Sequence, residues 1–260
     1  MKGQFDTTIS GFKPISLSEM NAQASFLDRI DTKYLVSEKE FAQVLEKLQE
    51  DFYVLDIGGK NVFSYDSVYM DTDEYLFYKQ HQNKEATRTK VRTRLYVESN
   101  LAFFEYKQKE NGTTRKFRYE FPSEEHGKMT KGKKRFFEGV YMSFYGQLPG
   151  KISPTLSSKY SRLTLCAKDS GERLTVDFNI RLKDLRKEGA KKVELNNVVI
   201  IESKSTASSC RSHEIMEEMG IKKAKSCSKY CLGLIYNEVH PFPGVFEETI
   251  EKLESLRNEK

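Results

Sequence analysis

The chain has 260 residues, and its 43 Lys and Arg against 38 Asp and Glu give a net charge of +5. No apolar run approaches the length of about 18 residues that spans a membrane, and the N-terminus lacks the apolar stretch of a signal peptide. A hydrophobic content of 38% with 17 Phe and 14 Tyr excludes a disordered chain and allows a sizeable core. The four cysteines form no CxxC pair and have no histidine partner at zinc spacing, so we expect reduced thiols and a cytoplasmic protein.

Segments rich in β-branched and aromatic residues run through the whole chain and predict strands. They cover about residues 25–35, 62–72, 88–98, 101–109, 114–121, 159–168, 171–178 and 198–204. Short turn sequences such as Asn111-Gly112 separate several of them, which predicts hairpins and an antiparallel sheet. Eight antiparallel strands with a few helices indicate an α+β protein built on a closed barrel or a strongly curved sheet.

Helix signals are fewer. Ser37 to Glu40 reads as a capping box, and the apolar residues that follow it fall on one helical face. Further helices are predicted near 133–146, from 208 or 209 to 220, near 227–236 and near 245–257, whereas 182–197 reads as an exposed connection. No boundary separates these elements, so we expect a single domain over 1–260.

Charged residues recur with the strand period of two. Arg88, Lys90, Arg92 and Arg94 share one strand face, opposite Thr89 and its apolar neighbours. The same alternation recurs around Lys107, Lys116, Arg173 and Glu202. One interpretation is a half-buried sheet whose charged face lies in water. However, the shared charges are mainly cationic across six strands, whereas a solvated sheet face usually mixes both signs.

Repulsion between these cations favours a second interpretation. Two cations about 7 Å apart on one strand repel by about 2 kcal/mol at an effective dielectric constant near 20. Inside a barrel, water and salt screen little of this, so a polyanionic ligand would be needed to neutralise the face. Arginine suits phosphate because its planar group binds phosphate oxygens bidentately. Glu105 and Glu202 among the cations are candidates to hold Mg²⁺ or Mn²⁺ beside phosphate, or else simply pair with lysines.

Nine motifs, in order along about residues 25–236, resemble the VTC-type polyphosphate polymerase domain, a branch of the triphosphate tunnel metalloenzyme (CYTH-like) superfamily. They are Arg29-Ile-Asp-Thr-Lys33-Tyr34, Ser67-Val-Tyr-Met-Asp71-Thr, Lys90-Val-Arg92-Thr-Arg94-Leu-Tyr96, Phe104-Glu105-Tyr-Lys107, Arg115-Lys116-Phe-Arg118, Tyr160-Ser-Arg162, Arg173-Leu-Thr-Val-Asp177, Ile201-Glu202-Ser-Lys204 and Ser228-Lys229-Tyr230. Outside the motifs, we expect residues 237–260 to contain a C-terminal helix.

The resemblance implies an eight-stranded antiparallel β tunnel with helices packed outside. It implies that the tunnel is lined by phosphate-binding cations, namely Lys33, Arg92, Arg94, Lys107, Lys116, Arg162, Arg173 and Lys229. Tyr160 would hydrogen-bond a phosphate, and Glu202 would bind a divalent metal, Mn²⁺ or Mg²⁺. Lys204 shares the strand face of Glu202 and should also point inward. Lys109 and Arg118 are further candidates near the ends of their strands.

The implied activity is an ATP-polyphosphate phosphotransferase that moves the γ-phosphate of ATP to a growing polyphosphate chain and releases ADP. The triphosphatases and adenylyl cyclases of the superfamily carry ExExK where this chain has Arg29-Ile-Asp31-Thr-Lys33. This segment has fewer acidic residues than ExExK, which favours phosphate transfer over metal-dependent hydrolysis. A tripolyphosphatase or nucleoside triphosphatase is the first alternative, and a non-catalytic polyphosphate or RNA binder is the second. The aromatic residues alternate away from the cations, which disfavours nucleic acid. The resemblance to eukaryotic VTC proteins does not extend to their SPX domain or their membrane helices. The sequence leaves open whether a separate membrane protein receives the product.

Overall fold

The computed structural model describes residues 5–23, 30–206 and 209–259. Within these residues one sheet contains all the strands: β1 (Lys13–Ile15), β2 (Ile30–Val36), β3 (Phe52–Leu55), β4 (Val62–Thr72), β5 (Thr87–Tyr96), β6 (Leu101–Glu110), β7 (Thr113–Phe121), β8 (Ile152–Ala167), β9 (Arg173–Asp184), β10 (Val193–Leu195) and β11 (Val199–Ser205). Each of the eight predicted strands corresponds to one of them, although residues 25–29 of the first prediction lie outside the described residues. The sequence predicts no strand at the short β1, β3 and β10. The segment 182–197, expected as a connection, partly belongs to β9 and β10.

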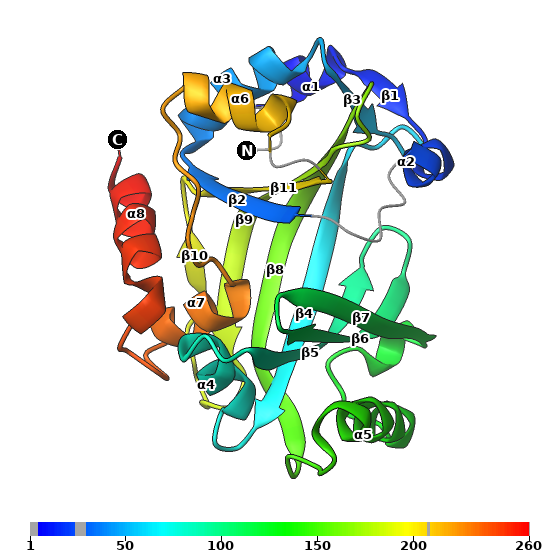
Figure 1. Cartoon of the computed structure of the whole chain (residues 1–260), viewed down its shortest axis with the longest axis vertical. Coiled ribbons are helices and arrows are strands. Elements are labelled where there is room, and N and C mark those ends of the chain that lie inside the picture. The colour runs from blue at the N-terminus through cyan, green and yellow to red at the C-terminus, as the bar shows by residue number, and fades with distance from the viewer. Residues whose placement is uncertain (1–4, 24–29, 207–208, 260) are drawn as a thin grey trace.

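The main path of the sheet runs in the order β2-β11-β9-β8-β4-β5-β6-β7, and every neighbouring pair along it is antiparallel. The long strands β4, β8 and β9 form the back of the molecule, and the two ends of the sheet, β2 with β11 and β5 to β7, cross in front of them (Figure 1). The prediction of an antiparallel α+β protein is therefore confirmed.

The prediction of a closed barrel is wrong, because the sheet curls into an open half-barrel and its end strands β2 and β7 do not pair. The outer edge of β2 is already occupied: Tyr34 forms a bridge with Lys223, and the Ala224 amide donates to the Lys33 carbonyl at 2.8 Å. At the other end, β7 is an edge strand whose exposed charges, Arg115 and Lys116, disfavour pairing with another strand.

The helices are α1 (Asp6–Ser10), α2 (Leu17–Gln23), α3 (Glu38–Leu48), α4 (Leu76–Gln82), α5 (Lys131–Tyr145), α6 (Arg211–Glu218), α7 (Lys229–Tyr236) and α8 (Glu247–Asn258), with 3₁₀ turns at Ser123–Glu125 and Gly244–Phe246. All five predicted helices are present. The capping box of α3 is confirmed, because Ser37 Oγ accepts from the Glu40 amide while Glu40 accepts from the Ser37 amide. The unpredicted α1, α2 and α4 are too short to show a helical period in the sequence.

Apolar packing covers the convex side of the half-barrel. Helix α3 places Phe41 and Leu45 on buried strand residues such as Val176 and Ile201. Helix α5 packs Phe137 on residues of β5 and β6. In the part of the chain that the structure describes, no helix has both the length and the apolar character needed to cross a membrane. The four cysteines are free thiols, as predicted.

A buried carboxylate fixes α4 and α7 to the end of β4. Asp71 is fully buried and accepts from the amides of Thr72, Phe77 and Tyr78 at 2.7 to 2.9 Å. It also accepts from the Tyr230 hydroxyl at 2.5 Å, which ties the start of α7 to α4. Asp71 belongs to one of the sequence motifs, and this hydrogen bonding gives it a structural role.

We expect Asp71→Ala to lower the free energy of unfolding by about 3 kcal/mol or more, because it leaves three amide donors and a hydroxyl buried without their acceptor. Urea denaturation measures the change. Asp73→Ala, at an exposed position two residues away, is the control and should stay within about 0.5 kcal/mol of the wild type. Equal stability of the two variants would contradict the anchoring role of Asp71.

Candidate functional site

The inner side of the half-barrel, here called the concave face, carries the charged side chains that alternate with the buried apolar ones. Its curvature brings together residues of strands that are not neighbours. Arg94 of β5 donates to the Tyr160 hydroxyl of β8 at 2.9 Å, across the intervening β4. Lys33 of β2 likewise lies close enough to Lys90 of β5 to lower its pKa. Because every strand alternates in the same sense, one continuous charged surface results.

One cluster on this face surrounds Glu202. Its Oε2 lies 2.5 Å from Lys204 Nζ, and its Oε1 lies 3.5 Å from Lys33 Nζ. Lys204 also donates to the Thr175 hydroxyl at 2.9 Å, and Lys33 donates to the Cys227 carbonyl at 2.9 Å. Burial raises the pKa of Glu202, but Lys204 and Lys33 outweigh it and hold that pKa well below its usual range. Burial lowers the pKa of Lys204 to about 8 despite the carboxylate beside it.

A second cluster is centred on Asp177, whose side chain is almost fully buried. Arg162 binds it bidentately at 2.6 and 2.7 Å, and Lys229 at the start of α7 binds it at 2.5 Å. Burial opposes ionisation of Asp177, yet Arg162 and Lys229 keep its pKa below the usual range. Tyr160 joins this cluster through the cation-π contact of Lys229, 4.7 Å from the ring centroid. Burial raises the pKa of Tyr160, but Arg94 and Arg162 more than offset it, so the pKa is lowered.

Glu105 is the centre of a third cluster. Arg92 Nε donates to its Oε2 at 2.6 Å, Arg94 lies 3.9 Å from the same oxygen, and Lys116 pairs with Oε1. Burial raises the pKa of Glu105, but these cations hold it well below the usual range. Burial lowers the pKa of Lys116 to about 8, with Glu105 opposing.

The remaining predicted residues differ in position. Lys107 lies on the concave face, where it is the register partner of both Lys90 and Lys116. Lys109 is half-buried near the end of β6, and Arg118 is exposed with its guanidinium 4.8 Å from the Phe103 ring centroid. Arg173 is directed toward α2 instead, donating to the Met20 carbonyl at 3.5 Å and to Asn21 at 3.4 Å. The predicted site is thus brought together apart from Arg173, which lies at its margin.

Two residues of the face were quoted in motifs but given no role from the sequence. Asp177 is the counter-charge of the second cluster, and Lys90 projects beside Lys107 and Arg92. The period-two alternation placed both on the charged face, so that signal was sufficient to find them. What the sequence lacked was the pairing, since Asp177 contacts Lys229 from an element 52 residues away.

The carboxylates differ in their ability to hold a divalent metal. Among residues 5–23, 30–206 and 209–259, no group of three or more His, Cys, Asp or Glu gathers as a metal site. Mg²⁺ and similar ions are often held by one or two carboxylates together with substrate phosphates. Glu202 fits this role because its side chain keeps 21% exposure and meets the Thr175 hydroxyl at 3.4 Å. Glu105, 2% exposed and engaged by cations on both oxygens, does not fit it.

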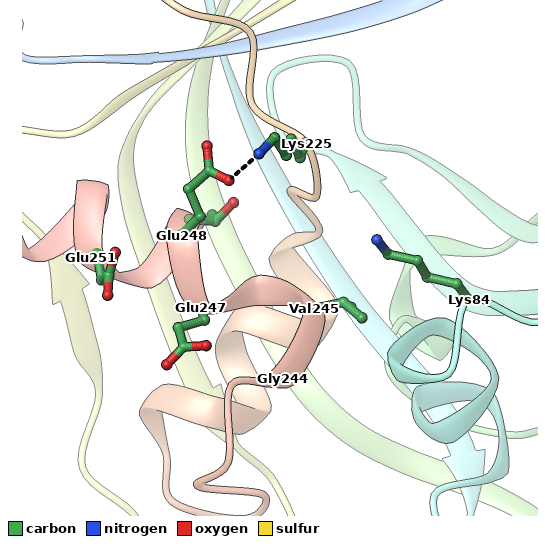
Figure 2. A pocket seen from close by; sticks show the side chains of 8 residues that line it. Lys84, Lys225, Gly244, Val245, Glu247, Glu248 and Glu251 are labelled. Carbon is green, nitrogen blue, oxygen red and sulfur yellow. Dashed lines mark ion pairs between the residues drawn. The ribbon is translucent and has the colours of Figure 1, made fainter.

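A surface hollow lies away from these clusters, between the α4–β5 turn and the start of α8. Lys84, Lys225, Glu247, Glu248 and Glu251 are among the residues that line it, and Lys225 pairs with Glu248 at 2.8 Å (Figure 2). Its opposite charges compensate one another, and none of the predicted site residues lines it.

Comparison with known proteins identifies solved structures with the same fold. Solved structures that share the fold include a putative adenylate cyclase from Bacillus halodurans and a protein from Hippeastrum described as a putative adenylyl cyclase with dominant triphosphatase activity. The first is 14% identical with a TM-score of 0.50, covering 77% of this chain and 94% of its own. The second is 13% identical with a TM-score of 0.51, covering 83% and 98%.

No curated protein sequence matches the chain. The family model of the VTC domain matches residues 28–236, which include all three clusters of the concave face. This match confirms the resemblance found in the nine motifs. The chain belongs to the VTC domain family.

Proposed function

We propose that this protein is a polyphosphate polymerase that transfers the γ-phosphate of ATP to the end of a growing polyphosphate chain and releases ADP. The observation that carries the proposal is the charge pattern of the concave face. Every carboxylate at the centre of a cluster is bound by at least two cations: Glu202 by Lys33 and Lys204, Asp177 by Arg162 and Lys229, and Glu105 by Arg92, Arg94 and Lys116. The cations outnumber the acids, which suits a ligand with many negative charges.

The same pattern favours transfer over hydrolysis. A hydrolase must activate water, for which a carboxylate of ordinary or raised pKa is suited. Glu105, Asp177 and Glu202 instead have pKa values held below the usual range by their cations. They are therefore poor proton acceptors. A phosphate acceptor is already ionised at neutral pH and attacks without losing a proton, so this site fits phosphate as the nucleophile.

The residues then act by position and charge. Arg92, Arg94 and Arg162 would bind the triphosphate of ATP through planar guanidinium groups. A terminal oxygen of the acceptor chain attacks the γ-phosphorus, the bond to the ADP oxygen breaks, and the chain grows by one phosphate. The cations stabilise the charge that spreads over the transferred group and the leaving ADP. The Tyr160 hydroxyl, which accepts a hydrogen bond from Arg94, would hydrogen-bond a phosphate oxygen.

Glu202 is the residue that would hold a divalent ion, Mn²⁺ or Mg²⁺. When bound, such an ion neutralises charge on phosphate oxygens. The Thr175 hydroxyl and Lys204 keep the Glu202 carboxylate oriented toward the concave face. The proposed ligands are ATP and inorganic polyphosphate, and a cytoplasmic location, where ATP is available, belongs to the same proposal.

Hydrolysis of a triphosphate is the second candidate, because the Hippeastrum protein with the same fold is described as having dominant triphosphatase activity. The two reactions share the binding of a triphosphate and differ only in the acceptor. Water reaching the γ-phosphorus through the open side of the half-barrel would turn the same residues into a hydrolase.

Products formed from ATP and Mn²⁺ distinguish these reactions. For the polymerase we expect a polyphosphate ladder on a urea gel together with ADP and little free phosphate. ADP with an equal amount of phosphate and no polymer would identify a triphosphatase. Neither product, together with tight polyphosphate binding, would make the protein a non-catalytic binder and refute both enzymatic assignments.

Glu202→Gln tests the metal-binding role. We expect the turnover rate with ATP and Mn²⁺ to fall by about 100-fold or more, because the amide is a weak ligand for a hard cation. Binding of tripolyphosphate without metal should be kept or strengthened, because one negative charge is lost. Glu194→Gln on β10, where the partly exposed Glu194 pairs with Lys192, is the matched control and should retain activity. Full activity of Glu202→Gln would refute this role.

Glu105→Gln tests whether Glu105 is a counter-charge. Loss of its charge leaves Arg92 and Lys116 without their carboxylate, so we expect tripolyphosphate to bind several-fold more tightly at low ionic strength. The unfolding free energy should fall, because the partly buried Arg92 loses its neutralising partner. Calorimetry and urea denaturation measure the two changes against Glu194→Gln. Weaker binding would instead show that Glu105 serves mainly to position Arg92.

A further inference from the structure

Two lysines of the concave face lie outside the cation–carboxylate clusters. Lys90 of β5 and Lys107 of β6 are register partners, so their side chains lie side by side on the same face. Neither ammonium group makes a hydrogen bond or an ion pair with a residue that the structure describes. Each cation that binds the three central carboxylates already has its counter-charge, whereas this pair has none in direct contact.

The groups that face Lys90 come from five elements. They are Arg92 on its own strand, Lys107 on β6, Lys33 on β2, Cys231 on α7 and His81 on α4, together with Cys227 just before α7. None of them is a carboxylate. Lys107 does interact with Asp31 and Glu202 across the concave face, but at longer range than an ion pair. The surroundings of Lys90 therefore favour its neutral form until an anion arrives.

Resting on the proposed function, we propose that Lys90 and Lys107 form a further phosphate subsite of the concave face, and that binding of phosphate there is coupled to protonation of Lys90. A phosphate group between the two ammonium groups supplies the negative charge that no carboxylate of the protein provides in direct contact. Because the other cations are already compensated, this subsite is where added negative charge gains most.

The protonation state of Lys90 in the ligand-free protein sets the direction in which phosphate binding depends on pH. Burial, with Lys33, Lys107 and Arg92, lowers the pKa of free Lys90 to about 7, so about half of the molecules carry a neutral Lys90 near pH 7. A bound phosphate raises this pKa, and a proton is taken up from solvent. Affinity should thus fall as the pH rises through and above 7, while binding at lower pH proceeds with Lys90 already charged.

Calorimetry with inorganic tripolyphosphate, without metal, tests the proposal on the full chain. Measurements near pH 7 in two buffers of different ionisation enthalpy give the number of protons taken up on binding. Lys90→Arg keeps the charge at all accessible pH values, Lys90→Met removes it, and Lys183→Met on the exposed side of β9 is the control. The difference between the wild type and Lys90→Arg cancels protons contributed by the ligand and by Lys116 and Lys204.

We expect the wild type to take up about half a proton more than Lys90→Arg near pH 7. Lys90→Met should weaken binding about tenfold at pH 6, whereas Lys90→Arg should bind at least as tightly as the wild type above pH 8. Wild-type binding and proton uptake in both Lys90 variants would overturn the subsite. Absence of tripolyphosphate binding by the wild type itself would instead refute the proposed function.

Discussion

Cations gathered on the inside of a curved sheet repel one another, and the structure depends on how this repulsion is offset. At about 7 Å and an effective dielectric constant near 20, each such pair contributes about 2 kcal/mol of repulsion. Glu105, Asp177 and Glu202 each bind two or more cations and so offset part of this repulsion. The carboxylates also order the side chains that the proposed function needs, because a bidentate contact such as that of Arg162 with Asp177 fixes the guanidinium plane.

The carboxylates do not neutralise all the positive charge of the concave face, and the charge that is left bears on ligand binding. A fully neutralised face would have little reason to bind a polyanion, whereas an uncompensated one would destabilise the fold. The protein lies between these limits: each central carboxylate pairs with two or more cations, whereas Lys90 and Lys107 have no carboxylate in direct contact. In the proposed function, the arginines that pair with carboxylates also bind phosphate, and Lys90 and Lys107 add positive charge that a ligand would neutralise.

The open half-barrel follows from a competition for the edge of β2. Pairing of β2 with β7 would close the sheet, but the segment at Lys223 and Ala224 already takes the backbone groups of Lys33 and Tyr34. The same segment leads into α7, which delivers Lys229 to Asp177 and Tyr230 to Asp71. The contact that prevents closure therefore also completes the second cluster.

The sequence by itself determined the eight main strands, the longer helices, the family and which side chains share the charged face. Each of these depends on local spacing: a period of two for strands, a capping box at Ser37, and motifs in a fixed order. Tertiary structure decided what local spacing cannot encode. The sheet forms an open half-barrel, Arg173 is directed toward α2, and Lys229 pairs with Asp177. These outcomes depend on contacts between elements distant in sequence, which compete for the same backbone edge or the same carboxylate.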